Sequence, residues 1–226
     1  MSVDVTLRSI EILLGFSFLL QTLEHLKNPY QLQTVFIIRL ILSVLLMIGF
    51  ETTVVSFVLL MTSLILLHYY QGPYNGGADR MGMLVLTCLC LSHISKTEQW
   101  QTLILGYLSL QLVLSYFISG WVKVKNAEWR NGRALSDVFQ FSAYPASESF
   151  RDWANSPFIL KVASWVVILF ELAFPFTLFS TLSLAAALVF AALFHVANAC
   201  LFGLNRFVWA WISAYPALLW FQLNIL

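Results

Sequence analysis

Long apolar stretches separated by short polar turns occupy almost the whole chain. A helix needs roughly 20 mostly apolar residues to cross a bilayer core about 30 Å thick, because its backbone hydrogen bonds are then satisfied internally. The pattern therefore predicts an all-α protein, a polytopic transmembrane helical bundle of about eight spans. The predicted spans are residues 5–24, 33–50, 52–70, 80–95, 101–121, 157–180, 182–202 and 206–224.

The connections between the predicted spans are mostly very short and carry turn residues such as Asn28-Pro29 and Gly72-Pro73. Short links favour antiparallel neighbours in a compact bundle, so we expect residues 1–226 to form a single transmembrane domain. The exception is the segment at about 122–156. It holds nine of the chain's charged side chains, of which 12 are basic and 11 acidic in total. Trp129 and Trp153, with Trp121 just before the segment, alternate with those charges, which is typical of a segment lying at a membrane interface.

Composition excludes an ordinary soluble enzyme. Of the 226 residues, 60% are hydrophobic and only 10% are charged, whereas a soluble domain has about 25% charged residues. The formal net charge of +1 gives no basic face for phosphate contacts, so we expect the lipid bilayer and no nucleic acid as partner. The three cysteines lie in apolar runs without the spacing of a metal site, so no metal is expected.

Polar residues inside the predicted spans are candidates for function, since each costs roughly 2.5–3.5 kcal/mol at mid-helix on insertion scales. His195 and Asn198 are three residues apart and lie on one helix face. They either bond to each other or to a neighbouring backbone, or form part of a site. The other such residues are Glu24, Arg39, His68, His93 and Glu171.

Tyr116, Gly120 and Lys123 lie at positions i, i+4 and i+7, so they share one face of the fifth predicted span, with Lys123 at the end of that span. Lys123 either extends its amine to the interface or, held in an apolar pocket, loses its proton and serves as a base. Arg39 has Glu171 and Glu24 as alternative partners across the bundle.

Two further polar positions are candidates outside that helix face. Arg130 with Arg133 is placed to hold a carboxylate, unless the pair lies on an exposed face. Asp79 ends a turn that begins at Tyr74, and its position favours capping of the next helix.

Three stretches of the chain together resemble the HTTM membrane-domain family, the vitamin K-dependent gamma-carboxylase-like proteins. Residues 116–123 (YFISGWVK), followed by 127–132 (AEWRNG), are similar to the family's Y-F-x-A-G-V-K-K and A-D-W-x-x-G. Residues 194–207, which begin FHVAN, are similar to F-H-x-x-N-x-x-L-F-x-I-x-x-F, and residues 74–83 resemble the polar turn of bacterial members.

The resemblance implies a membrane domain in which a lysine deprotonates a reduced quinone that then reacts with oxygen. Counted from Gly120 the matching lysine is Lys123, and counted back from Trp129 it is Lys125. His195 and Asn198 are then catalytic with Lys123. The substrate-binding residues implied are Tyr116, Arg130, Asp79 and Glu171.

The chain departs from the carboxylase pattern in two places. The turn reads Tyr74-Asn75-Gly76-Gly77 where the family has W-N-N-H, so a polar group is missing unless His68 or Asp79 replaces it. The large soluble domain that holds the peptide substrate is also absent from the sequence.

We accordingly expect one of two functions in a multi-pass protein of a bacterial inner membrane. The first is a quinol- and oxygen-dependent enzyme acting on a lipid-soluble or peptide substrate. The alternative is a non-catalytic membrane subunit or maturation partner of another protein, with a peptide or protein partner.

Overall fold

The protein folds as two compact units in the computed structural model, which describes residues 1–26, 32–69, 77–95, 97–142 and 144–226. The described residues contain helices and no strand, which confirms the all-α prediction. Unit 1 comprises Met1–Leu110 and Arg206–Leu226, and unit 2 comprises Gln111–Asn205. The long helix α5 (Glu98–Lys125) passes from the first unit into the second.

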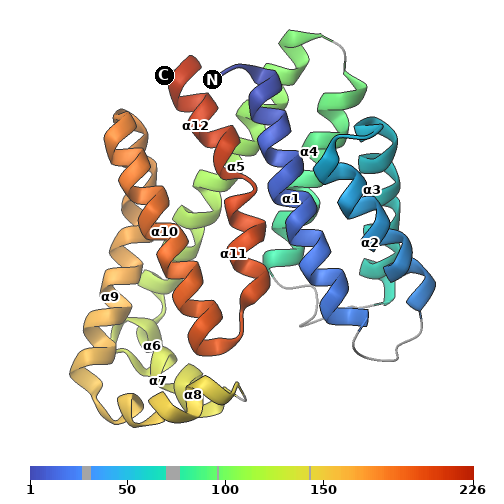
Figure 1. Ribbon diagram of the computed structural model, residues 1–226. Helices are drawn as coiled ribbons and strands as arrows, with labels where there is room; N and C mark the ends of the chain where they lie inside the picture. Colours follow the sequence, from blue (N-terminus) through green and yellow to red (C-terminus); the bar gives the residue numbers. More distant parts are fainter. Residues whose placement is uncertain (27–31, 70–76, 96, 143) are drawn as a thin grey trace. The chain divides into compact units, whose positions relative to one another are not determined.

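Unit 1 is a helical bundle in which α1 (Val3–Leu26) lies beside α2 (Gln33–Ile48), α4 (Gly77–Ile94) and α12 (Tyr215–Asn224) (Figure 1). The close packing of α1 on α2 depends on Gly15, because a methyl group there would lie 2.9 Å from the carbonyl oxygen of Ser43. The helix α3 (Thr52–Tyr69) packs against α2 and α4, and α11 (Asn205–Ile212) precedes α12.

Unit 2 contains a pair of apolar helices and a group of short ones (Figure 1). The pair is α9 (Pro157–Ala173), continued by the 3₁₀ segment η3 (Phe174–Phe179), and α10 (Thr181–Phe202). Pro175 explains the change of helix type, because its ring excludes an α-helical hydrogen bond. The short elements are α6 (Ala127–Arg130), α7 (Arg133–Phe141), α8 (Pro145–Phe150) and the 3₁₀ segment η2 (Arg151–Asn155).

Within the described residues, four helices are long and apolar enough to cross a membrane, namely α3, α5, α9 with η3, and α10. Large apolar side chains such as Phe158, Phe179 and Leu182 are about four-fifths exposed on them, as expected of surfaces in contact with lipid. The predicted count of about eight spans is not confirmed. One predicted span, 206–224, is broken into α11 and α12 near Pro216, which has no N–H to continue the helical ladder.

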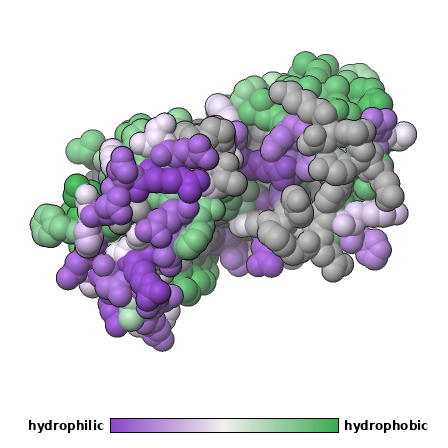
Figure 2. Space-filling view, turned by 90° about the horizontal axis from the view of Figure 1, so that it is seen from below, coloured by the Kyte–Doolittle hydropathy of each residue, from purple (hydrophilic) through white to green (hydrophobic). Residues whose placement is uncertain are grey.

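The charged segment at 122–156 forms the end of α5 and the short helices of unit 2. Its Phe139 is buried and packs edge-on against Phe202 of α10 and against Leu160 of α9, so an apolar side chain ties this segment to the two long helices. Figure 2 shows hydrophilic residues gathered over the short helices, beside hydrophobic surface. This arrangement is consistent with the predicted interfacial position of the segment.

Candidate functional site

The helices α5 and α9 bring a lysine and a glutamate together inside unit 2. The Nζ of Lys123 lies 2.6 Å from both carboxylate oxygens of Glu171. The lysine side chain is 17% exposed and the glutamate side chain 4% exposed, so the pair is largely removed from solvent. A buried ion pair of this kind is a candidate for proton transfer, because burial disfavours both charged forms.

Gly120 allows this approach. It lies one turn before Lys123 on the same face of α5, and a methyl group at that position would lie 2.9 Å from the Cβ of Glu171 and from the backbone nitrogen of Leu172. Only a residue without a side chain lets the two backbones come so close. The sequence motif that contains Gly120 and Lys123 is therefore a packing motif as well as a chemical one.

A second polar contact joins α5 to α10. The hydroxyl of Tyr116 and the Nε2 of His195 share a hydrogen bond of 3.0 Å between two buried side chains. The ring of Tyr116 also stacks on Phe174, with the ring centroids 4.1 Å apart. The tautomer of His195 decides which group donates.

The Tyr116–His195 and Lys123–Glu171 contacts lie on one face of α5 but at different positions along its axis. Tyr116 and Lys123 are seven residues apart, which is about 10 Å along a helix. His195 therefore does not act on the amine of Lys123 directly. Asn198 is half-buried on α10, and its side chain makes no hydrogen bond with the described residues. The structure thus joins four of the predicted residues in two pairs across helices, Lys123 with Glu171 and Tyr116 with His195, and leaves Asn198 without such a bond among the described residues.

Arg130 and Lys125 lie close to the pair without touching it. The Nη1 of Arg130 donates to the carbonyl oxygens of Val124 and Lys125 at 2.8 and 3.1 Å, and so caps the end of α5. The Nζ of Lys125 lies 4.6 Å from the ring centre of Trp121, whereas that of Lys123 lies 5.2 Å from the ring centre of Trp129. Of the two alternative lysines, Lys123 is the one with a carboxylate partner in the part of the chain that the structure describes.

Asp79 lies in unit 1, in a different polar cluster. The helix α4 begins at Gly77, so Asp79 belongs to its first turn and does not cap it as predicted. The carboxylate instead accepts a 2.9 Å hydrogen bond from Gln21 and lies 3.7 Å from Arg206. Burial raises the pKa of Asp79, against the opposing effect of Arg206. The part of the predicted turn at residues 74–76 lies outside the described residues.

Arg39 pairs with neither of its two predicted partners. The residue is 1% exposed, and its guanidinium donates to the hydroxyls of Thr62 and Ser63 at 2.9 and 2.8 Å and to the Oε1 of Gln21 at 3.3 Å. Glu171 is bound to Lys123, and Glu24 accepts a 3.1 Å bond from Arg206. Sequence cannot foresee this, because pairing depends on which helix faces touch. His68, the other possible replacement for the missing histidine, is exposed on α3.

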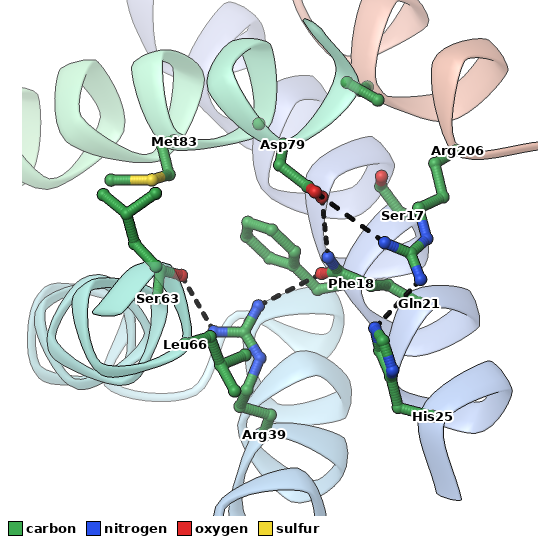
Figure 3. Close-up of a pocket in the computed structure, with 14 residues that line it drawn as sticks. Ser17, Phe18, Gln21, His25, Arg39, Ser63, Leu66, Asp79, Met83 and Arg206 are labelled. Carbon is green, nitrogen blue, oxygen red and sulfur yellow. Dashed lines mark hydrogen bonds and ion pairs between the residues drawn. The ribbon is translucent and has the colours of Figure 1, made fainter. Parts of the chain in front are cut away.

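A pocket of unit 1 surrounds Arg39 and was not foreseen from the sequence. Figure 3 shows Arg39, Gln21, Asp79, Arg206 and His25 joined in a chain of hydrogen bonds and ion pairs along it. The volume open to water is about 60 Å³, enough for a few water molecules or one small ion. The sequence did offer one signal, Arg39 itself, because an ionisable residue within a predicted membrane span is a candidate for a functional site.

A substitution at Gly120 tests whether close packing of α5 on α9 holds the ion pair. We expect Gly120→Ala to lower the free energy of unfolding by about 1–3 kcal/mol, because the added methyl group overlaps the backbone of α9. Gly106→Ala on the same helix is the matched control, since its methyl group would lie 3.7 Å from Phe221, an ordinary contact. Thermal unfolding in detergent measures both, and equal loss in the two variants would contradict the packing role.

The comparisons with known proteins agree with the helical architecture. The HTTM domain family matches residues 79–223, which include both polar contacts of unit 2 as well as Asp79. Searches of curated proteins and of solved structures gave no match. Among the described residues, no three His, Cys, Asp or Glu side chains are grouped closely enough to hold a metal ion. With a match over more than half of its length and four helices able to span a bilayer, the chain is a membrane protein that belongs to the HTTM domain family.

Proposed function

We propose that this protein is a membrane enzyme that removes a proton from a weakly acidic hydroxyl of an apolar substrate, a reduced quinone being the chemistry that the family resemblance implies. The observation that carries the proposal is the pair of Lys123 and Glu171, held at 2.6 Å inside a unit built of apolar helices. A general base must lie within reach of the proton that it removes, and this pair offers a proton acceptor among apolar helices.

The two side chains act as one acceptor. In the resting pair Lys123 carries the extra proton and Glu171 the negative charge. The carboxylate of Glu171 accepts the substrate proton directly, or Lys123 first gives its own proton to Glu171 and the neutral amine then accepts the substrate proton. Both routes end in a neutral carboxylic acid beside an ammonium group. One proton enters in either case, and the positive charge that remains on Lys123 stabilises the anion formed on the substrate.

The surroundings of the pair fit a flat apolar substrate. Trp129 lies against Lys123, and Tyr116 with Phe174 forms a stacked aromatic wall about two turns before Lys123 on α5. His195, bonded to the hydroxyl of Tyr116, fixes the orientation of that ring. A bound quinol supplies the electrons for reaction with oxygen, whereas the chain supplies the base, the charge and the apolar walls.

Oxygen consumption by the purified protein with reduced naphthoquinone tests the proposal. We expect turnover in the native protein and loss to background in Lys123→Ala, because the variant lacks the amine of the pair and the positive charge that stabilises the substrate anion. Lys125→Ala is the matched control, since the amine of Lys125 lies on Trp121 and has no carboxylate partner among the described residues. We expect this variant to keep most of the activity.

Two results would contradict the proposal. One is equal activity of Lys123→Ala and the native protein, and the other is no turnover with any reduced quinone. Either result would favour the alternative function, a non-catalytic subunit or maturation partner, which co-purification with a stoichiometric protein would then support. The bacterial inner membrane stays a prediction in both cases.

A further inference from the structure

We infer that the pocket around Arg39 in unit 1 is a binding site for an oxyanion, a phosphate group in particular. The inference does not depend on the proposed function, because all the lining residues belong to unit 1 and the base pair belongs to unit 2. It depends on the charge, the burial and the unused hydrogen-bond donors of the pocket.

Arg39 has a charge without a direct counter-ion. No carboxylate of the described residues lies within 4.0 Å of its guanidinium, and Gln21 stands between it and Asp79 (Figure 3). The guanidinium is nonetheless almost fully buried. Buried charges are normally paired, because an unpaired one loses its hydration without recovering the energy elsewhere. An anion in the pocket supplies the missing partner.

The donors that Arg39 leaves unused form its bidentate edge. The Nη1 donates to hydroxyls of α3, whereas the Nε has no partner among the described residues and the Nη2 has only the long bond to Gln21. An arginine binds carboxylate or phosphate through such a fork of two parallel N–H groups. The edge is therefore chemically suited to an oxyanion and unsatisfied without one.

Neighbouring groups favour a phosphate over a smaller carboxylate. The hydroxyl of Ser17 also lines the pocket and makes no hydrogen bond with the described residues. Arg206 contributes a second positive charge, although Glu24 and Asp79 pair with it. Donors thus approach the cavity from several directions, which matches the three or four oxygens of phosphate better than the two of a carboxylate.

Of the two other ionisable side chains of the pocket, His25 is neutral and Asp79 is paired with Arg206. His25 accepts a 2.9 Å bond from Arg206, which requires a neutral ring, and burial followed by the charge of Arg206 lowers the pKa of His25. Asp79 carries the one carboxylate of the lining, and burial raises its pKa.

The position of the pocket points to a phospholipid head group as one source. Five helix ends meet there, because α1 and α3 end nearby and α2, α4 and α11 begin. Arg39 is six residues into α2, about 9 Å along the helix. Basic pockets near helix ends are where membrane proteins bind acidic lipid heads, and Phe18, Leu66 and Met83 supply apolar walls for the adjoining chain.

The test measures phosphate and lipid binding by the full-length protein. The unfolding temperature of delipidated protein in detergent is measured in potassium phosphate and in potassium chloride of equal ionic strength. Native mass spectrometry then compares the retention of phosphatidylglycerol with that of phosphatidylcholine. Stabilisation by inorganic phosphate identifies the free ion, and selective retention of phosphatidylglycerol identifies the head group. Either supports the inference.

Variants assign the binding to the pocket. We expect Arg39→Gln to weaken phosphate or lipid binding at least about tenfold, because a charged hydrogen bond is lost. We expect Ser17→Ala to weaken it about fivefold, because a neutral hydrogen bond is lost. Arg80→Gln is the control, since Arg80 is exposed on α4 and outside the lining. Should Arg39→Gln fail to fold, Ser17→Ala still decides.

The inference is overturned by any of three results. The first is binding of neither phosphate nor phosphatidylglycerol. The second is that Ser17→Ala binds as well as the native protein while Arg39→Gln either also binds fully or does not fold. The third is equal weakening by Arg80→Gln, which would indicate an effect of net charge alone.

Discussion

Glu171→Leu is expected to lower the free energy of unfolding by about 3–5 kcal/mol, because it leaves the ammonium of Lys123 without its partner inside unit 2. The desolvation of a charge is tolerable only when an opposite charge compensates for it, and both oxygens of Glu171 do so at 2.6 Å. The midpoint of thermal unfolding, followed by tryptophan fluorescence in detergent, measures the loss.

The double variant Lys123→Met with Glu171→Leu separates the charge from the packing. Replacing a whole buried ion pair by apolar side chains of similar size is often neutral or stabilising, so we expect this variant to unfold near the temperature of the native protein. Equal destabilisation by Glu171→Leu alone and by the double variant would contradict a buried ion pair. Because the double variant lacks the proposed base, it should be stable and inactive.

Gly132→Ala is expected to cost about 2–5 kcal/mol and to loosen the junction of α6, α7 and α9. Gly132 has a φ of +87°, a conformation that costs other residues roughly 1–2 kcal/mol. Its added methyl group would also lie 2.7 Å from the backbone nitrogen of Lys161, which cannot move independently of α9, and overpacking adds about 1–3 kcal/mol. Trypsin should then cut faster at the neighbouring Arg133.

Gly49→Ala is the matched control for this prediction. Its φ of +83° gives the same backbone strain, but the nearest atoms are those of the Arg8 guanidinium at 3.1 Å and beyond, the end of a long side chain. The difference between the two variants therefore measures the overlap with α9. If both lose the same stability, the contact of Gly132 with α9 has no energetic importance.

Helices were predictable because each carries its own signal. The stretches at 5–24, 33–50, 52–70 and 182–202 fold as helices close to those bounds, since apolar runs of that length satisfy their backbone only as helices. The break between α11 and α12 was missed although Pro216 signalled it, because the apolar run continues across it. Hydropathy does not detect a local loss of one hydrogen bond.

The polar residues that matter could be selected from sequence, but their partners could not. Lys123, Glu171, Tyr116 and His195 were all selected, and the structure joins the first to the second and the third to the fourth. The sequence instead offered Arg39 as a partner for Glu171. A helix presents several polar residues around its axis, and only the packed neighbours decide which of them meet.

The amino-acid sequence by itself determined the class of this protein, an all-helical membrane protein of the HTTM family, because hydropathy and local motifs are properties of short segments. Tertiary structure decided everything that depends on approach between segments. It paired Lys123 with Glu171 across the space that Gly120 leaves open, and it left the buried Arg39 at a cavity where no carboxylate of the described residues touches its guanidinium. Pairing energies act over a few ångströms, and such distances exist only once the helices have packed.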